Sequence, residues 1–287
     1  MQSTSHEEIN RWINELEALR TKRTCQGPRF VKPFQLATLA HMLRLQNPGS
    51  LILPEKIAPY ADTMNLWGAL GIESPFPEKN RNAAGRYHPI TLLQDEKTID
   101  AAANDLAVLF RSVCENAQTI DAVQTMMREL IGNCYAHSEA HDGVYGVVCA
   151  QVWSAGRKAQ ICLADTGIGI RASLEQNVTL ADRLNSENCC YMATEFGITS
   201  KPGMGHSGYG LHVARRLLEQ NKGVLYVRSG HEAFILARGD TTSLKTRPHW
   251  NGTLLVIEWN LDEPVDIGQV YRELPLPEDM SDDDFNF

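Results

Sequence analysis

Apolar residues recur every three or four positions near the start of the chain, and this spacing predicts helices there. In residues 7–20, EEINRWINELEALR, the apolar positions fall on one helical face. Residues 33–45 predict a second helix, and residues 57–71 predict a third that ends at Gly71. The short apolar run SLILP, residues 50–54, is typical of a strand. Together these elements predict a small α/β unit.

A stretch rich in loop-forming residues follows this unit. Residues 71–91, GIESPFPEKNRNAAGRYHPIT, predict a linker or a long surface connection, with a domain boundary near residue 90. The resulting division is an N-terminal unit over residues 1–90 that recruits or regulates, a main domain over residues 91–262, and a tail over residues 263–287. Because the tail is strongly acidic, we expect it to be solvated and mobile.

The main domain alternates between helical and strand patterns. Helices are predicted at 97–116, 120–138 and 209–220, with short helices up to residue 197, and strands at 144–153, 159–165, 223–229, 233–237 and 252–259. The last three strands follow one another with no helix between them, which favours antiparallel pairing. We therefore expect an α+β fold, a two-layer sandwich with helices on one face of a mixed, mostly antiparallel sheet.

Composition narrows the class of protein. Hydrophobic residues make up 43% of the chain and charged residues 22%, which are ordinary values for a globular protein. A formal net charge of -8 disfavours direct binding to the nucleic-acid backbone. The seven cysteines form no CxxC pair and show no zinc-site spacing, so they are interpreted as reduced thiols. With no apolar leader and no membrane-length apolar run, we expect a cytoplasmic protein without a membrane partner.

Three polar side chains share one face of the helix predicted at 120–138. Glu129, Asn133 and His137 are four residues apart. An Asn carbonyl oxygen suits Mg²⁺, and a nearby carboxylate can orient or deprotonate an attacking group. Taken alone, a solvated polar stripe explains the pattern better.

A carboxylate and two glycines stand at the end of the strand predicted at 159–165. Asp165 can accept a hydrogen bond from an exocyclic amino group, and Gly167 and Gly169 allow a flat ring to approach the backbone. A plain turn explains an isolated DxGxG equally well.

Glycine-rich backbone leads into the helix predicted at 209–220. The run TSKPGMGHSGYGL contains Gly205, Gly208 and Gly210, and free amides at a helix N-terminus form a site for phosphates. A surface loop before a capped helix is the simpler alternative. Further on, Gly252 and Thr253 begin an apolar strand, from which a hydroxyl can reach a ligand.

The order of these four motifs resembles the ATP-binding domain shared by gyrase, heat-shock chaperones, histidine kinases and mismatch-repair ATPases, the Bergerat or GHKL fold. The resemblance covers residues 95–260. It implies that Asn133 binds Mg²⁺, that Glu129 is the general base and that His137 lies near the phosphates. It also implies that Asp165 accepts from adenine, supported by Gly167, Gly169 and Thr253. The segment GYGL resembles the family's GLGL, so Gly208, Gly210 and Leu211 are assigned to the phosphate loop, with Lys201 adding a charge and Gly205 spaced one residue off the common pattern.

The resemblance implies a Mg²⁺- and ATP-binding signalling protein that hydrolyses ATP or transfers its γ-phosphate to a partner protein, as a kinase does. It is similar to the anti-sigma serine-kinase branch and to stand-alone bacterial ATP-binding proteins, since NCYAH ends in His where many histidine kinases have Lys. The alternative is a nucleotide-gated binding module with little or no turnover. His6 beside Glu7 resembles a phosphoacceptor pair, but an ordinary surface histidine is favoured. A homodimer formed through the N-terminal helices is one arrangement that would cover their apolar face.

Overall fold

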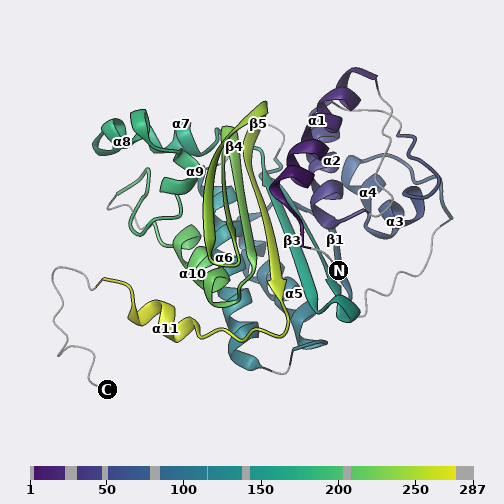
Figure 1. The fold of residues 1–287 in the computed structure, drawn as a ribbon. Helices are drawn as coiled ribbons and strands as arrows, with labels where there is room; N and C mark the ends of the chain where they lie inside the picture. The colour runs from purple at the N-terminus through teal and green to yellow at the C-terminus, as the bar shows by residue number, and fades with distance from the viewer. Residues whose placement is uncertain are drawn as a thin grey trace.

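The computed structural model describes residues 3–22, 31–46, 51–77, 85–114, 116–137, 143–202 and 208–275. These residues form one five-stranded sheet between two layers of helices (Figure 1). The helices are α1 (His6–Lys22), α2 (Pro33–Gln46), α3 (Ala58–Thr63), α4 (Leu66–Leu70), α5 (Ile99–Arg111), α6 (Ala117–His137), α7 (Ile170–Leu174), α8 (Ala181–Ser186), α9 (Cys189–Met192), α10 (Gly210–Gln220) and α11 (Ile267–Arg272). Among the described helices, none combines the length and the apolar character that crossing a bilayer requires.

The sheet is antiparallel at every described pairing. Its strands are β1 (Tyr87–Leu93), β2 (Gly146–Trp153), β3 (Lys158–Asp165), β4 (Val224–Ala237) and β5 (Asp240–Asn260), in the spatial order β1-β2-β3-β5-β4. The expected α+β sandwich is confirmed. The two strands predicted at 223–229 and 233–237 are one strand, β4, which passes through an irregular register at Gly230. The strand predicted at 252–259 is the second half of the longer β5.

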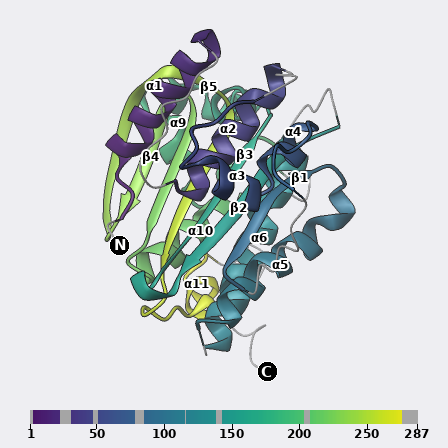
Figure 2. The ribbon, with the colours of Figure 1, turned by 90° about the vertical axis from the view of Figure 1, so that its right-hand side faces the viewer.

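Both faces of the sheet are apolar, and each face is covered by its own helices. Along β5, Leu255 and Ile257 pack with α5, α6 and α10, whereas Leu254 and Val256 face α1 and α2. Figure 2 shows the N-terminal helices lying across the second face of the sheet. A sheet buried on both sides explains why its central strands are almost continuously apolar.

The N-terminal layer differs from its prediction in two places. The strand predicted at 50–54 is absent from residues 51–54, the described part of that range, so the described part of this layer is helical. The helix predicted at 57–71 is interrupted, because Asn65 adopts a left-handed conformation with φ 63° between α3 and α4. It ends at Gly71 as predicted. The predicted boundary at residue 90 falls inside β1, a strand that was assigned to the linker.

A buried polar cluster fixes the start of α1 to the sheet. The Glu258 carboxylate accepts hydrogen bonds from the Thr4 amide at 3.0 Å and from the Gln160 side chain at 3.1 Å. Lys32 Nζ donates to Thr4 Oγ1 at 2.9 Å and pairs with Glu8 at 2.8 Å. Buried polar groups must be satisfied in this way, so the cluster specifies where the N-terminal segment docks.

Candidate functional site

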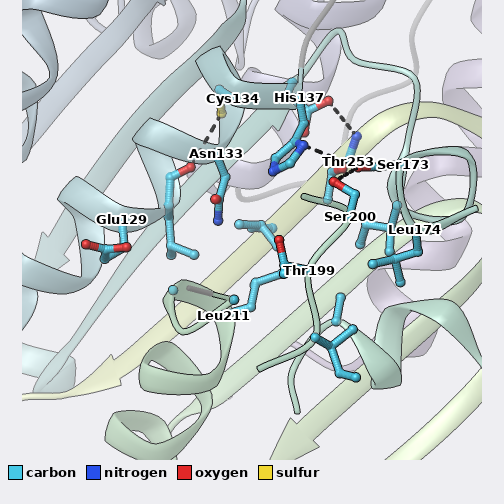
Figure 3. A pocket seen from close by; sticks show the side chains of 18 of the residues that line it. Glu129, Asn133, Cys134, His137, Ser173, Leu174, Thr199, Ser200, Leu211 and Thr253 are labelled. Carbon is cyan, nitrogen blue, oxygen red and sulfur yellow. Dashed lines mark hydrogen bonds between the residues drawn. The ribbon is translucent and has the colours of Figure 1, made fainter. Parts of the chain in front are cut away.

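The polar stripe of α6 forms one side of a pocket on the face of the sheet opposite α1. Glu129, Asn133 and His137 all line it, and Cys134 lies between them (Figure 3). Helical spacing turns Leu130 and its buried neighbours toward the core. Burial raises the pKa of the Cys134 thiol, and the charge of Asp165 raises it further. Cys134 therefore lines the pocket as an uncharged thiol.

Asp165, the last residue of β3, supplies a carboxylate at the inner end of this pocket. Its Oδ1 accepts the amide N–H of Gly167 at 2.8 Å and the amide N–H of Thr253 at 2.9 Å. Both amide bonds end on Oδ1, so neither of them uses the acceptor capacity of Oδ2. Burial raises the pKa of Asp165 to about 6, although the hydrogen bonds from Gly167 and Thr253 lower it. At neutral pH the group is therefore an ionised, partly desolvated acceptor.

Gly252 makes this arrangement possible because it has no side chain. It has φ 76°, and a Cβ at this position would overlap the backbone carbonyl of Asp165. The close approach of the two strands places the Thr253 amide on the Asp165 carboxylate. The sequence-based site contained Thr253 but not Gly252.

The glycines after Asp165 shape the connection to α7. Gly169 has φ 84°, and a Cβ there would lie 2.7 Å from the Ser229 hydroxyl of β4. The next residue, Ile170, donates its amide to Ser229 Oγ at 2.8 Å. This loop is consequently held against β4 while Gly169 remains in the pocket wall.

The N-terminus of α10 closes the other end of the pocket. Gly210 is its first residue, and a Cβ on Gly210 would lie 3.2 Å from Glu129 Cβ and 3.3 Å from Asn133 Nδ2. Gly208 has φ 68° and packs on the backbone of Gly197 and Ile198. The first residue of α10, whose amide has no partner within the helix, therefore lies against the polar stripe of α6.

A chain of hydroxyl groups joins α6, α7 and the segment before α10. The Ser173 hydroxyl lies 3.2 Å from His137 Nδ1 and donates to the Ser200 hydroxyl at 3.1 Å. The Asn177 side chain donates to the Thr199 carbonyl at 2.9 Å. Ser173, Thr199 and Ser200 line the pocket, and the motif analysis missed them because only the fold brings α7 and this segment together.

Most of the residues predicted for the site meet in this pocket. Its lining includes Glu129, Asn133, His137, Asp165, Gly169, Gly208, Gly210, Leu211 and Thr253. Gly167 contacts Asp165 but lines a neighbouring cavity. Lys201 does not line the pocket, since its Nζ donates to the Ala136 carbonyl in the last turn of α6 at 2.9 Å. Gly205 lies outside the described residues.

The donor set of the pocket contains groups that can bind a nucleotide. Within the described ranges, no group of three or more His, Cys, Asp or Glu side chains is placed to hold a metal ion. The pocket offers the half-buried carboxylate of Asp165, the N-terminal end of α10 and the side-chain oxygen of Asn133. Mg²⁺ is commonly held by few protein oxygens together with substrate phosphates, so this set is compatible with it.

Comparison with known families agrees with this geometry. Residues 118–249 match the family described as histidine kinase-, DNA gyrase B-, and HSP90-like ATPases. Comparison with curated proteins gives no significant match. The matched segment begins in α6, contains Asp165 and the helix α10, and ends in β5 shortly before Thr253. This match, together with the geometry of the pocket, supports a GHKL-type ATP-binding domain in this part of the chain.

Proposed function

We propose that this protein is a Mg²⁺- and ATP-dependent signalling protein that hydrolyses ATP or transfers its γ-phosphate to a partner protein. The observation that carries the proposal is the approach of the α10 N-terminus to Glu129 and Asn133. It brings an anion-binding helix end, a carboxylate and a side-chain oxygen to the same end of the pocket.

Each end of the pocket has a separate role in this proposal. At the inner end, Asp165 accepts the adenine amino group, with Gly169 and Thr253 beside it. At the outer end, the amides of Gly208, Gly210 and Leu211 bind phosphate oxygens. Asn133 would hold Mg²⁺, which would neutralise charge on the phosphates.

Glu129 is the proposed general base. It is exposed at the pocket rim, where water or a partner's hydroxyl can reach it. A carboxylate at that position can orient the attacking oxygen and accept its proton.

The position of His6 disfavours this side chain as the phosphoacceptor of its own chain. His6 begins α1, which packs on the sheet face opposite the pocket (Figure 1). The sheet therefore separates this side chain from Glu129 of the same chain. Transfer within one chain to His6 is disfavoured by this arrangement.

One observation favours the alternative, a nucleotide-gated switch that binds a partner with little turnover. Strand β5 carries Thr253 in the pocket and Glu258 in the cluster that anchors the N-terminal segment. A change at one position can reach the other along a single strand. This alternative uses the same pocket and differs in its need for Glu129.

The test is calorimetric titration with a non-hydrolysable ATP analogue, with and without Mg²⁺, followed by phosphate release from ATP. For the enzyme, we expect Mg²⁺-dependent binding, and Glu129→Gln should lose at least about 100-fold in turnover while still binding the analogue. The matched control is Asp121→Asn, an exposed carboxylate on the same helix. Turnover that survives in Glu129→Gln contradicts the assigned base, and binding without turnover in the wild type supports the switch.

A further inference from the structure

Ser229 stands where the regular pairing of β4 with β5 stops. It pairs with Thr253, and the register shifts between Ser229 and Gly230. Ser229 is 4% exposed, so its hydroxyl needs partners within the protein. Thr253, its partner on β5, lines the nucleotide pocket, whereas Ser229 does not.

The hydroxyl of Ser229 joins two segments that are far apart in sequence. It accepts the amide hydrogen of Ile170 at 2.8 Å and donates to the carbonyl oxygen of Gly252 at 2.9 Å. A hydroxyl offers one donor and two acceptor positions, and here both kinds are used. One side chain thus holds the loop after Asp165 against the start of the buried part of β5.

The Gly252 carbonyl and the Thr253 amide belong to the same peptide group. Ser229 donates to the oxygen of this group, and its N–H donates to Asp165 Oδ1 at 2.9 Å. Successive hydrogen bonds through one peptide group polarise each other and fix its orientation. Ser229 is therefore connected to the Asp165 carboxylate through a single peptide plane.

We propose that Ser229 is a positioning residue that sets the preference of the pocket for purines bearing a 6-amino group. It acts through the Gly252–Thr253 peptide, which orients Asp165, and through Ile170, which fixes the adjoining loop. This inference rests on the proposed binding of adenine by Asp165 and assigns a residue that controls that recognition.

The experiment compares ADP with purine riboside 5′-diphosphate, which has hydrogen in place of the 6-amino group. Neither ligand has a γ-phosphate, so turnover does not disturb the calorimetric titration. We expect the wild type to prefer ADP by at least about 10-fold, the value of a hydrogen bond to a charged group. In Ser229→Ala, this preference should fall to within about 3-fold, while the affinity for the purine analogue changes by less than about 3-fold.

The ratio of the affinities for ADP and the purine analogue separates a positioning role of Ser229 from a merely structural one. If Ser229→Ala weakens both ligands equally, or leaves the ADP preference intact, the proposal is overturned. Ser229→Cys keeps a weak S–H donor on a slightly larger side chain, so it should retain an intermediate preference even if Ser229→Ala does not fold. A full wild-type preference in Ser229→Cys also overturns the proposal.

The control is Ser243→Ala, an exposed serine on β5 beyond the irregular register. It should leave both affinities unchanged. If the wild type binds neither ligand, the proposed nucleotide function itself fails. That outcome is distinct from loss of the ADP preference alone.

Discussion

Replacing Asp165 by Asn should stabilise the nucleotide-free protein and weaken its nucleotide binding. Asn has nearly the same shape, and its Oδ1 can still accept the amides of Gly167 and Thr253. The change is at Oδ2, where the NH₂ donor of Asn replaces an oxygen of the ionised carboxylate. The two effects have opposite signs, so they can be told apart from general damage to the fold.

The stability gain follows from the pKa of Asp165. Burial raises this pKa from its ordinary value of 3.8 to about 6, so the folded protein holds the proton more tightly than the unfolded chain. At about 1.4 kcal/mol per pH unit, keeping this group ionised at pH 7 costs at most about 3 kcal/mol. Asn carries no charge, so we expect a gain of about 1–3 kcal/mol in the free energy of unfolding.

The stability gain of Asp165→Asn should be largest above pH 6 and should decrease as the pH falls. Above pH 6 the carboxylate is ionised in both states, and the full cost is present in the wild type. As the pH falls through 6, the folded protein takes up a proton while the unfolded chain remains ionised, and the cost shrinks. By about pH 4 the folded state is protonated and the unfolded chain is about half protonated, so most of the difference between wild type and Asp165→Asn should be gone.

Nucleotide binding should fall because two donors would face each other, the Asn amide and the adenine amino group. Losing a hydrogen bond to a charged acceptor costs about 1.5–3 kcal/mol, which corresponds to about 10- to 150-fold in Kd. Urea denaturation at pH 7 and pH 4 measures the first effect, and calorimetry with ADP measures the second. Asp121→Asn is the control. An unchanged affinity would show that Asp165 is not the adenine acceptor, and equal stability at pH 7 would refute the burial argument.

Two further substitutions test the close approaches that build the fold. Gly252→Ala should destabilise the protein by at least about 2 kcal/mol in urea denaturation, because the φ of Gly252 is 76° and the new Cβ would overlap the Asp165 carbonyl. If the variant is as stable as the wild type, this close approach of the two strands is contradicted. Asn10→Ala should cost about 1–3 kcal/mol, because Asn10 Oδ1 accepts from the fully buried Arg228 at 2.8 Å and from the Tyr226 hydroxyl at 3.0 Å. The neighbouring exposed Arg11→Ala is its control, and equal stability of both variants would refute the role of Asn10.

Local spacing was sufficient to predict the parts of the site that lie on single elements. The stripe of α6 follows from helical periodicity, and Asp165 followed by glycines follows from a strand that ends at a turn. Gly210 was predicted because a glycine run before a helix has a recognisable physical use. These residues come together as the family resemblance implied.

Contacts between distant elements could not be predicted in the same way. Ser229 lies in a segment with no motif, and its role appears only when Ile170 and Gly252 lie beside it. Lys201 was predicted near the phosphates by its charge, and its hydrogen bond to the Ala136 carbonyl at the end of α6 depends on a contact between distant segments. Similarly, the first part of β1 was assigned to the linker because residues 71–91 contain three prolines and several loop-forming residues. Pro89 is tolerated in this strand because β1 lies at the edge of the sheet.

The alternation of side chains along a strand joins the pocket to the N-terminal helices. In β4, Ser229 bonds to the pocket loop, while the adjacent Arg228 extends to the other face and bonds to Asn10 of α1. In β5, Thr253 and Glu258 divide between the two faces in the same manner. Deleting the chain up to the end of α2 would therefore expose the second apolar face of the sheet and remove Thr4 from Glu258 and Asn10 from Arg228 at once. A truncated chain would report on stability rather than on regulation, so the point substitution Asn10→Ala is the sharper probe of whether the N-terminal layer influences nucleotide binding.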